Sequence, residues 1–541
     1  MSPALSLRGS AEVAQLVEQR TENPCVRSSI LRLGTIFKLK QKRLIMRKWI
    51  NLIFGLFSLT IQFHFAAGAW AAETFLVKPY LQLGYETKSD ATTATIVWFT
   101  GTAGSTTKDS VKVDQEQQKW KVEVKSGNSP DFKPAESVLE RLVALPGMAA
   151  PVKKYTARFT RLNPGAPFTY RLATGGAEVF TATATAKKSA DQPFKVTIFG
   201  DCGANTDGQR AIAQQVFKAK PDLVVIPGDI VYQHGLFHQY LTNFFPVYNQ
   251  DAEEPSHKGV NKNLSVPMLR SIHTVGVLGN HDIALDGKGT NFEKHPDAMA
   301  YFIFWNQPLN GPGTGYGDRN TPPIVGEERK LELFKKSAGD AYPAMSNFSF
   351  NYGNSHWTVL DGNYYMDWTD QKTRKWLIDD LKGAQKATWR FVTFHQPAFS
   401  IDLPHGNEQR MRLISDILKK YKVDIVYAGH AHCYERSYPL TFLPKKGLKN
   451  FTVNANGTVT GALTTDTEYD GVTKTIPKGT IHIVTGAGGA RLYLQGLPSD
   501  FILKYDSNDY SFTVMDVNDK TLTIKQINSK GKVIDQFVVT K

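Results

Sequence analysis

Cysteine is scarce in this chain of 541 residues, and three positions hold it: Cys25, Cys202 and Cys433. No cysteine directly follows the apolar segment near the N-terminus, so lipoprotein processing is unsupported. No cysteine belongs to the set of candidate metal ligands described below, which points away from iron–sulfur chemistry.

Long runs of basic residues are also missing, although the formal net charge is +14. Residues 1–72 hold ten Lys or Arg and three Asp or Glu, so the net charge of the remaining chain is +7. The Lys and Arg residues of that part are scattered, without an interleaved aromatic stripe. A nucleic-acid platform is not indicated, whereas mild attraction of small anionic substrates is expected.

A secretory signal is predicted inside the N-terminal part of the chain. A basic start at Met46-Arg47-Lys48 precedes an apolar stretch, and Ala69-Trp70-Ala71 supplies a small-residue cleavage pattern. This combination is typical of a signal peptide, which we place at residues 46–72. Gln62 and His64 interrupt the apolar run and disfavour a permanent membrane span.

The signal assignment predicts where the mature protein begins and where it resides. We expect translation to start at Met46, with residues 1–45 a spurious or disordered extension. The protein is then secreted or periplasmic, with no stable membrane span after signal removal. A retained amphipathic anchor is the alternative.

Five short apolar runs each lead into a glycine or a residue with a metal-binding side chain. Apolar, β-branched runs of this length predict buried strands. In open α/β sheets, ligands bind beyond the carboxyl ends of the strands, and glycine lets the chain turn sharply there. The runs are 195–199, 222–226, 274–278, 391–394 and 423–427, and they lead into Gly200-Asp201, Gly228-Asp229 with Tyr232, Gly279-Asn280, His395 and Gly429-His430-Ala431-His432. Together these strand ends predict one metal site.

The seven candidate ligands fit two metal ions better than one. A bridging carboxylate would let them make four bonds to each ion and leave positions for water or substrate. Two ions about 3.5–4 Å apart suit in-line phosphoryl displacement. Mixed nitrogen and oxygen ligands without thiolate favour iron, zinc or manganese.

These blocks resemble those of the metallophosphoesterases, and Tyr232 makes the sequence similar to the purple acid phosphatases over about residues 75–541. The continuation Tyr434-Glu435-Arg436-Ser437 also matches. The resemblance implies that ferric iron is held by Asp201, Asp229, Tyr232 and His432. It further implies that a divalent ion (iron, zinc or manganese) is held by Asp229, Asn280, His395 and His430.

The chemistry of a tyrosine ligand also indicates the metal, independently of the family. A phenol has a pKa of about 10, so binding as phenolate at neutral or acidic pH needs a strong Lewis acid. Ferric iron suits this role better than zinc or magnesium, and a trivalent ion lowers the pKa of bound water further than a divalent one.

Two further histidines are candidate catalytic residues through the resemblance. His281 directly follows Asn280, and its family counterpart contacts substrate and helps to protonate the leaving group, with Asp282 available to orient it. His405 lies at the offset where plant members carry substrate-binding histidines, although Pro404 replaces a second histidine found there. The alternatives are a structural turn residue for His281 and a solvated loop residue for His405.

Other polar residues near the blocks are weaker candidates. We expect His234 and His238 to be surface residues near the entrance, His273 and His356 to be structural, and Arg436 to make a structural ion pair.

The domain organisation follows from a change in periodicity. Residues 73–186 alternate with period two, which predicts a small antiparallel sandwich. The resemblance implies that it is a fibronectin type III-like domain. Residues 192–541 form the catalytic domain, with insertions at about 283–345 and 445–475. The predicted fold is therefore a four-layer α/β/β/α metallophosphoesterase sandwich preceded by an all-β domain.

The function that these features favour is hydrolysis of small phosphate monoesters by metal-bound hydroxide at a binuclear centre, as in a purple acid phosphatase. A phosphodiesterase using the same site is the nearest alternative. A non-catalytic adhesion or carbohydrate-binding module is the alternative from another class, and the intact ligand set argues against it.

The two remaining cysteines each follow a predicted ligand of the same ion. Cys202 comes after Asp201, and Cys433 comes after His432. Their backbones should therefore lie close together, and an oxidising compartment would allow a disulfide. Two inert buried thiols are the alternative.

Overall fold

The computed structural model describes residues 75–87, 90–101, 120–251, 265–447, 450–451 and 453–541. Residues Thr74–Lys541 form one compact unit. The predicted extension 1–45 and signal peptide 46–72 lie outside the described residues. Within the described ranges, no helix combines the length and the apolar character that crossing a membrane would need.

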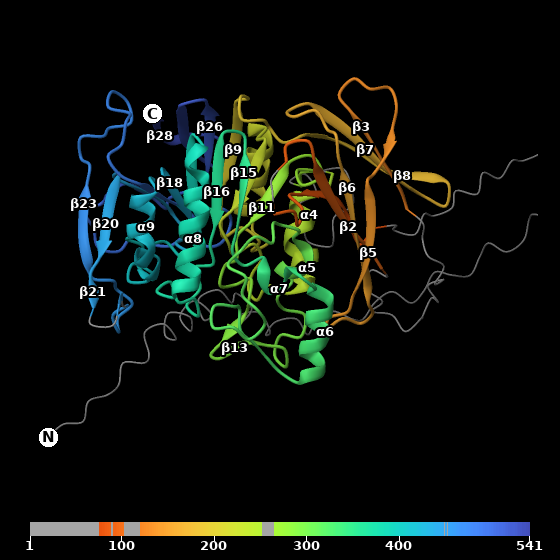
Figure 1. Cartoon of the computed structure of the whole chain (residues 1–541), viewed down its shortest axis with the longest axis horizontal. Helices are drawn as coiled ribbons and strands as arrows, with labels where there is room; N and C mark the ends of the chain where they lie inside the picture. The colour runs from red at the N-terminus through yellow and green to blue at the C-terminus, as the bar shows by residue number, and fades with distance from the viewer. Residues whose placement is uncertain (1–74, 88–89, 102–119, 252–264, 448–449, 452) are drawn as a thin grey trace, which may run out of the picture. The chain divides into compact units, whose positions relative to one another are not determined.

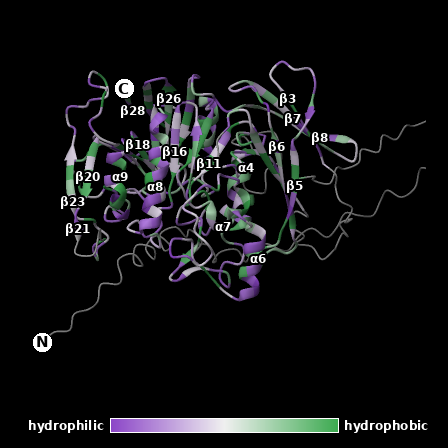
Figure 2. Cartoon of the chain, in the orientation of Figure 1, coloured by the Kyte–Doolittle hydropathy of each residue, from purple (hydrophilic) through white to green (hydrophobic). Residues whose placement is uncertain are grey.

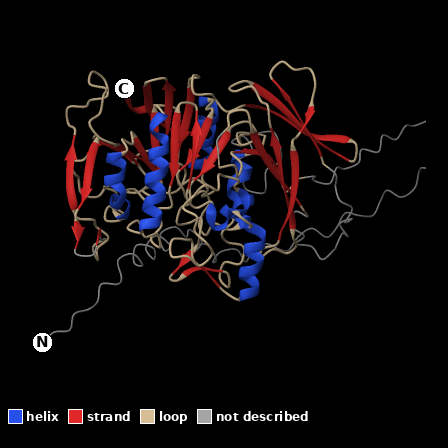
Figure 3. Cartoon of the chain, viewed as in Figure 1, coloured by secondary structure: helices blue, strands red, loops and turns tan. Residues whose placement is uncertain are grey.

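The first part of the described chain is built from two antiparallel sheets of four strands each (Figure 3). One sheet has the order β1-β2-β6-β5 and the other the order β4-β3-β7-β8. The strands are β1 Val77–Gln82, β2 Ala94–Thr100, β3 Lys121–Ser126, β4 Lys133–Pro134, β5 Ser137–Val143, β6 Val152–Phe159, β7 Pro167–Thr174 and β8 Ala177–Thr185. In β7, alternate residues Phe168, Tyr170 and Leu172 are buried in a core shared with Trp98. The all-β part thus follows from the period-two pattern, while its fibronectin type III-like identity stays a prediction.

Three of the five predicted strands lie side by side in a six-stranded sheet. Its order is β11-β10-β9-β26-β27-β28, with β9, β10 and β11 parallel and the C-terminal strands antiparallel. The strands are β9 Phe194–Ile198, β10 Leu223–Ile226, β11 His273–Gly276, β26 Ser511–Asn518, β27 Thr521–Asn528 and β28 Val533–Thr540. The ends of the three parallel strands therefore bring the first three ligand blocks to one edge.

The other two predicted strands lie in a seven-stranded sheet of order β15-β16-β17-β18-β24-β19-β25. Strands β16, β17, β18 and β24 are parallel to one another. The strands are β15 Phe348–Tyr352, β16 Ser355–Val359, β17 Trp389–Thr393, β18 Ile425–Ala428, β19 Tyr434–Ser437, β24 Ile481–Thr485 and β25 Ile502–Asp506. The histidine blocks follow β17 and β18.

The two sheets pack face to face, and helices cover their outer faces (Figure 1). Val225 and Met515 of one sheet share a buried core with Phe391 and Ile483 of the other. Helix α2 (Asp207–Ala219) packs on the outer face of the six-stranded sheet. Helices α8 (Gln371–Gly383) and α9 (Ser415–Lys420) pack on the outer face of the seven-stranded sheet. Figure 2 shows mostly hydrophobic central strands and a hydrophilic exposed side on α8. The predicted four-layer architecture is confirmed.

Two helices of the outer layers begin at side-chain caps. Thr206 accepts a hydrogen bond from Gln209 N at the start of α2, and Asp370 accepts one from Thr373 N at the start of α8. Such caps satisfy backbone donors that the first helical turn leaves open.

The predicted insertions contain short elements. The first includes β12 Leu285–Asp286, β13 Gly289–Asn291, β14 Ile324–Val325, α5 Tyr301–Phe304, α6 Glu328–Ala338 and α7 Ala341–Ala344. The second contains β20 Leu440–Pro444 paired with β23 Gly461–Thr465, and β21 Lys446–Gly447 paired with β22 Asn450–Phe451. The other short helices are α3 Phe237–Gln239, η1 Tyr240–Phe244, α4 Phe245–Tyr248, η2 Ala384–Lys386 and η3 Arg410–Ile414.

Candidate metal centre

Three of the predicted ligands occupy backbone conformations that few residues other than glycine adopt. Asp201, Asp229 and His430 have φ angles of 57°, 49° and 68°. Each directly follows a glycine at the end of a parallel strand. Such left-handed positions are uncommon outside glycine and cluster at functional sites. The glycine–ligand pairs in the sequence thus correspond to sharp turns that aim side chains at one point.

The glycines are also needed for close approach. A Cβ atom on Gly228 would lie 2.4 Å from His395 Nδ1, and one on Gly279 would lie 2.2 Å from Asp229 N. Neither position has room for a side chain, so these strand ends can meet only with glycine at both places.

The first group of side chains surrounds the hydroxyl of Tyr232. The tyrosine oxygen lies 3.1 Å from Asp201 Oδ1, 3.1 Å from Asp229 Oδ2 and 3.0 Å from His432 Nε2. The donor atoms of Asp201, Asp229 and His432 all lie within 4.8 Å of one another. The structure thus brings together the four residues predicted to hold the first ion.

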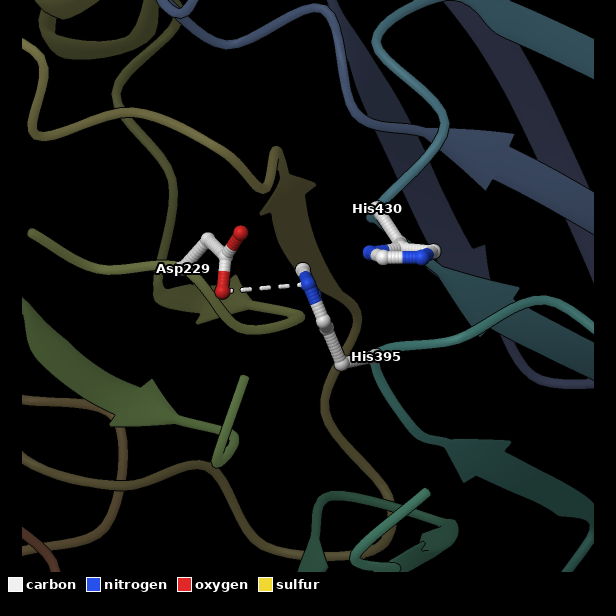
Figure 4. Close-up of side chains that lie close together, drawn as sticks. All are labelled: Asp229, His395 and His430. Atoms are coloured by element: carbon white, nitrogen blue, oxygen red, sulfur yellow. Dashed lines mark ion pairs between the residues drawn. The ribbon is translucent and has the colours of Figure 1, made fainter. Parts of the chain in front are cut away.

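The second group shares Asp229 with the first, and Figure 4 shows Asp229 with two other members of the second group, His395 and His430. His395 Nε2 lies 3.1 Å from Asp229 Oδ1 and 3.0 Å from Asn280 Oδ1. Donor atoms of Asp229, His395 and His430 again lie within 4.8 Å of one another. Asp229 therefore stands between the two groups, where a bridging carboxylate is expected.

Hydrogen bonds on the outer side of the rings orient two of the histidines. His432 Nδ1 lies 2.7 Å from the carbonyl oxygen of Arg491, and His395 Nδ1 lies 2.8 Å from that of Pro227. Each Nδ1–H donates to its carbonyl, so Nε2 is left to face the site. Histidines that bind metals are held in this way.

The electrostatics of the centre suit bound cations. Asp201 and Asp229 are at most 1% exposed, and the ion pairs that the structure gives them are with histidines. Burial lowers the pKa of His395, but the two carboxylates outweigh it and raise that pKa to about 9. Burial likewise raises the pKa of Asp229, and the neighbouring His395 and His281 overcome this and lower it. Buried carboxylates of this kind are normally paired or bind metals, so the donor set fits two ions.

His281 stands beside both groups. Its backbone N–H donates to Asp229 Oδ1 at 2.9 Å, and its ring centre lies 4.5 Å from that of Tyr232. His281 Nδ1 lies 2.8 Å from the carbonyl oxygen of Gln233.

The expectation that Asp282 orients His281 is wrong. The Asp282 carboxylate instead accepts hydrogen bonds from Ile230 N and Gly279 N. It therefore fixes the two turns that carry Asp229 and Asn280, and the Gln233 carbonyl holds the His281 ring. Burial and the charge of Asp229 raise the pKa of Asp282 to about 7.

His405 is not a solvated loop residue. It is 5% exposed, its Nδ1 lies 2.8 Å from Asp402 Oδ2, and its ring centre lies 4.0 Å from that of His430. Asp402 is held in turn by the Ser400 hydroxyl, which donates to Asp402 Oδ1 at 2.9 Å and lies 2.9 Å from Glu435 Oε1. His405 thus lines the site at a fixed position.

Glu408 was not predicted from the sequence. Its Oε2 lies 3.2 Å from His430 Nε2, and its side chain is 38% exposed at the rim. Burial raises its pKa, but His430 and His405 outweigh this and lower it to about 2. A single glutamate in a polar loop gives no signal that distinguishes it from a surface residue.

The weaker candidates lie outside the two groups. His234 stacks on His295 with ring centres 4.2 Å apart, and His238 pairs with Asp297. His273 is the first residue of β11 and is fully buried, and His356 contacts Asn351 and Asp380.

Arg436 makes the expected structural ion pair. Its Nε donates to Asp535 Oδ2 at 2.6 Å, and both side chains are buried.

The cysteine disulfide does not form. Cys202 and Cys433 are both free and buried. The Cys202 thiol faces Ile230 O at 3.7 Å, whereas that of Cys433 faces Glu435 Oε1 at 3.5 Å. They belong to different apolar clusters, so following ligands of the same predicted ion does not bring their side chains together.

Two known family models match the parts of the chain that contain the blocks described above. Residues 194–434 match the family model of calcineurin-like phosphoesterase, and residues 479–536 match that of iron/zinc purple acid phosphatase-like protein C. The fold and the matched blocks define a calcineurin-like phosphoesterase. Within that class, the C-terminal match and the relatives make the chain similar to the purple acid phosphatases.

Individual relatives are distant. Purple acid phosphatase 23 of Arabidopsis thaliana is 24% identical over 260 residues, which cover 45% of this chain and 48% of the relative. A nucleotide pyrophosphatase/phosphodiesterase of Hordeum vulgare is 28% identical over 225 residues, covering 37% and 52%. The chain spans about half the length of the curated relatives it matches. The structure of purple acid phosphatase PPD1 from yellow lupin seeds shares the fold, with a TM-score of 0.58 at 18% identity, over 85% of this chain and 74% of that chain.

Proposed function

We propose that this chain hydrolyses phosphate monoesters at a binuclear metal centre. The observation that carries the proposal is the convergence of two donor groups on one shared carboxylate, Asp229. Asp201, Tyr232 and His432 complete one group, and Asn280, His395 and His430 complete the other.

The types of ligand around the centre support a proposal for the two ions. The phenol of Tyr232 between two carboxylates suits ferric iron, and the amide and two histidines suit divalent iron, zinc or manganese. When bound, two such ions activate water and stabilise charge on the phosphoryl oxygens.

The surrounding side chains position the substrate and move protons. His281 stands beside Asp229 and is held by the Gln233 carbonyl, which suits protonation of the leaving group. His405 faces the second group and is fixed by Asp402. It is placed to donate a hydrogen bond to a phosphoryl oxygen.

A phosphodiester is the second candidate substrate, and Glu408 favours it. Its low pKa keeps the carboxylate charged beside His405 and His430. A negative charge at the rim opposes the two charges of a monoester dianion more than the single charge of a diester. One relative is named as a nucleotide pyrophosphatase/phosphodiesterase.

We further propose that the protein is secreted or periplasmic. The support is the basic, apolar and small-residue pattern at residues 46–72. Mass spectrometry of the native protein should find an N-terminus near Ala72; peptides from residues 1–45 would contradict this.

The enzymatic proposal is tested by metal analysis and hydrolysis of two chromogenic esters. The iron-supplied protein should contain two ions and hydrolyse p-nitrophenyl phosphate faster than bis(p-nitrophenyl) phosphate. The variant Asp229→Ala should lose both ions and both activities, whereas Asp297→Ala, which removes a carboxylate outside the two donor groups, should keep them. An active Asp229→Ala variant would refute the proposal, and the reverse order of rates would select the diesterase.

A further inference from the structure

A cavity lies against the loop that carries His405. Its volume is about 360 Å³, and Pro404 and Gly406 belong to its wall. His405, between them in sequence, instead contacts His430. The loop therefore separates this cavity, which we call the Arg412 cavity, from the metal centre.

The guanidinium of Arg412 lines this cavity and is only 9% exposed. Its Nε donates to Ala398 O at 2.7 Å. Its central carbon lies 4.4 Å from the ring centre of Phe399 and 5.7 Å from that of Phe501. Within the described residues, Arg412 forms no ion pair, and the hydrogen bond of its side chain is the one from Nε to Ala398 O.

Among the residues that the structure describes, the guanidinium charge has no paired carboxylate, because the Asp402 carboxylate of the same cavity wall is held by Ser400 and His405. Burial lowers the pKa of Arg412 to about 10, so it stays protonated at neutral pH. Aromatic rings stabilise a cation over their faces, but they do not use its hydrogen-bond donors. A guanidinium presents its terminal N–H groups as a fork that matches an oxyanion.

The other residues that line the Arg412 cavity indicate which further chemical groups a ligand would have. Ser400, Gln409 and Ser499 contribute polar groups. Leu403 and Leu497 also line the cavity and are 66% and 88% exposed. Exposed leucines beside a buried cation suit an anion with a short apolar tail.

We propose that the Arg412 cavity binds a small amphiphilic oxyanion, with its head on the Arg412 guanidinium and its tail on Leu403 and Leu497. This site is separate from the metal centre and does not rest on the proposed phosphatase activity. Asp402 belongs to the cavity wall and also holds His405, so the bound anion lies directly behind a predicted substrate contact.

Isothermal titration of the metal-loaded protein with hexanoate and with hexylphosphonate tests the proposal, and the two probes distinguish a carboxylate head from a phosphate-like head. At least one probe should bind saturably. Arg412→Gln should weaken binding about tenfold or more, because a charge-assisted hydrogen bond is lost.

Because Arg412 is buried, an exposed variant provides an independent test. Leu497→Asp places a negative charge at the cavity rim and should weaken binding several-fold. Its matched control is Leu494→Asp, at a leucine that is 73% exposed and outside the cavity wall, and it should bind like the wild type.

A metal-centre variant separates the two sites. His395→Ala removes a predicted metal ligand and should leave probe binding intact, whether or not the protein proves to be a phosphatase. The proposal is overturned if neither probe binds at millimolar concentration. It is also overturned if binding is lost in His395→Ala and unchanged in Leu497→Asp.

Discussion

Replacing Tyr232 with phenylalanine removes one oxygen from the centre of the first donor group. That oxygen lies 3.0–3.1 Å from donor atoms of Asp201, Asp229 and His432. The ring is 5% exposed and packs against His281, so phenylalanine fills the same space. Loss of the buried hydroxyl should cost the metal-free protein about 1–3 kcal/mol of stability, which a fold of this size tolerates.

The effect on the metal should be larger. Loss of a residue that only supports a ligand weakens metal affinity about 10–100-fold, and Tyr232 is itself a predicted ligand. We therefore expect at least that loss for the first ion and a smaller one for the second. The wild type with iron should show a visible charge-transfer band, and Tyr232→Phe should lack it. Activity with manganese or zinc should survive in part.

The assay compares absorption spectra, metal content and pH–rate profiles of wild type, Tyr232→Phe and a matched control. Tyr240→Phe serves as control, because that tyrosine is fully buried but its hydroxyl contacts Trp305. The reasoning is refuted if Tyr232→Phe binds iron as tightly as the wild type. A colourless, iron-free wild type most active at alkaline pH would refute the ferric assignment.

Three further outcomes follow from the contacts. His281→Ala should keep both ions and lose about 10²–10⁴-fold in turnover if it is the general acid; equal losses for good and poor leaving groups would show a positioning role instead. Burial lowers the pKa of His273 to about 3. Between pH 6.5 and 3 the unfolded chain therefore binds a proton that the folded chain excludes, and the free energy of unfolding decreases as the pH is lowered. His273→Phe should therefore lose about 2 kcal/mol less stability than the wild type between pH 7.5 and 5, as measured by urea unfolding; equal losses would contradict the assignment. Cys202 and Cys433 should react with a thiol reagent only after unfolding. If the unfolded mature chain shows no two reactive thiols, the prediction of a disulfide between them is supported instead.

The convergence of the seven candidate ligands could be predicted from the sequence, because the turns that place them are encoded locally. A glycine followed by a ligand at a strand end defines the turn, as at Gly228-Asp229 and Gly429-His430, and parallel strands bring such turns together. Adjacency in sequence gave wrong predictions where the contact depended on the direction of the side chain. Asp282 follows His281 but points to the backbone of Ile230, and the two cysteines follow ligands but face different clusters. Glu408 was missed because only the folded loop brings it to His430.

The predicted ions draw ligands from both halves of the catalytic domain. Asp201, Asp229 and Asn280 follow strands of the six-stranded sheet, whereas His395, His430 and His432 follow strands of the seven-stranded sheet. Each donor group takes members from both sheets, so neither half alone could hold either ion. A sliding of one sheet against the other by the length of a single residue would pull both groups apart. Metal loading should therefore act as a cross-link between the halves and stabilise the packing of the core that the two sheets share.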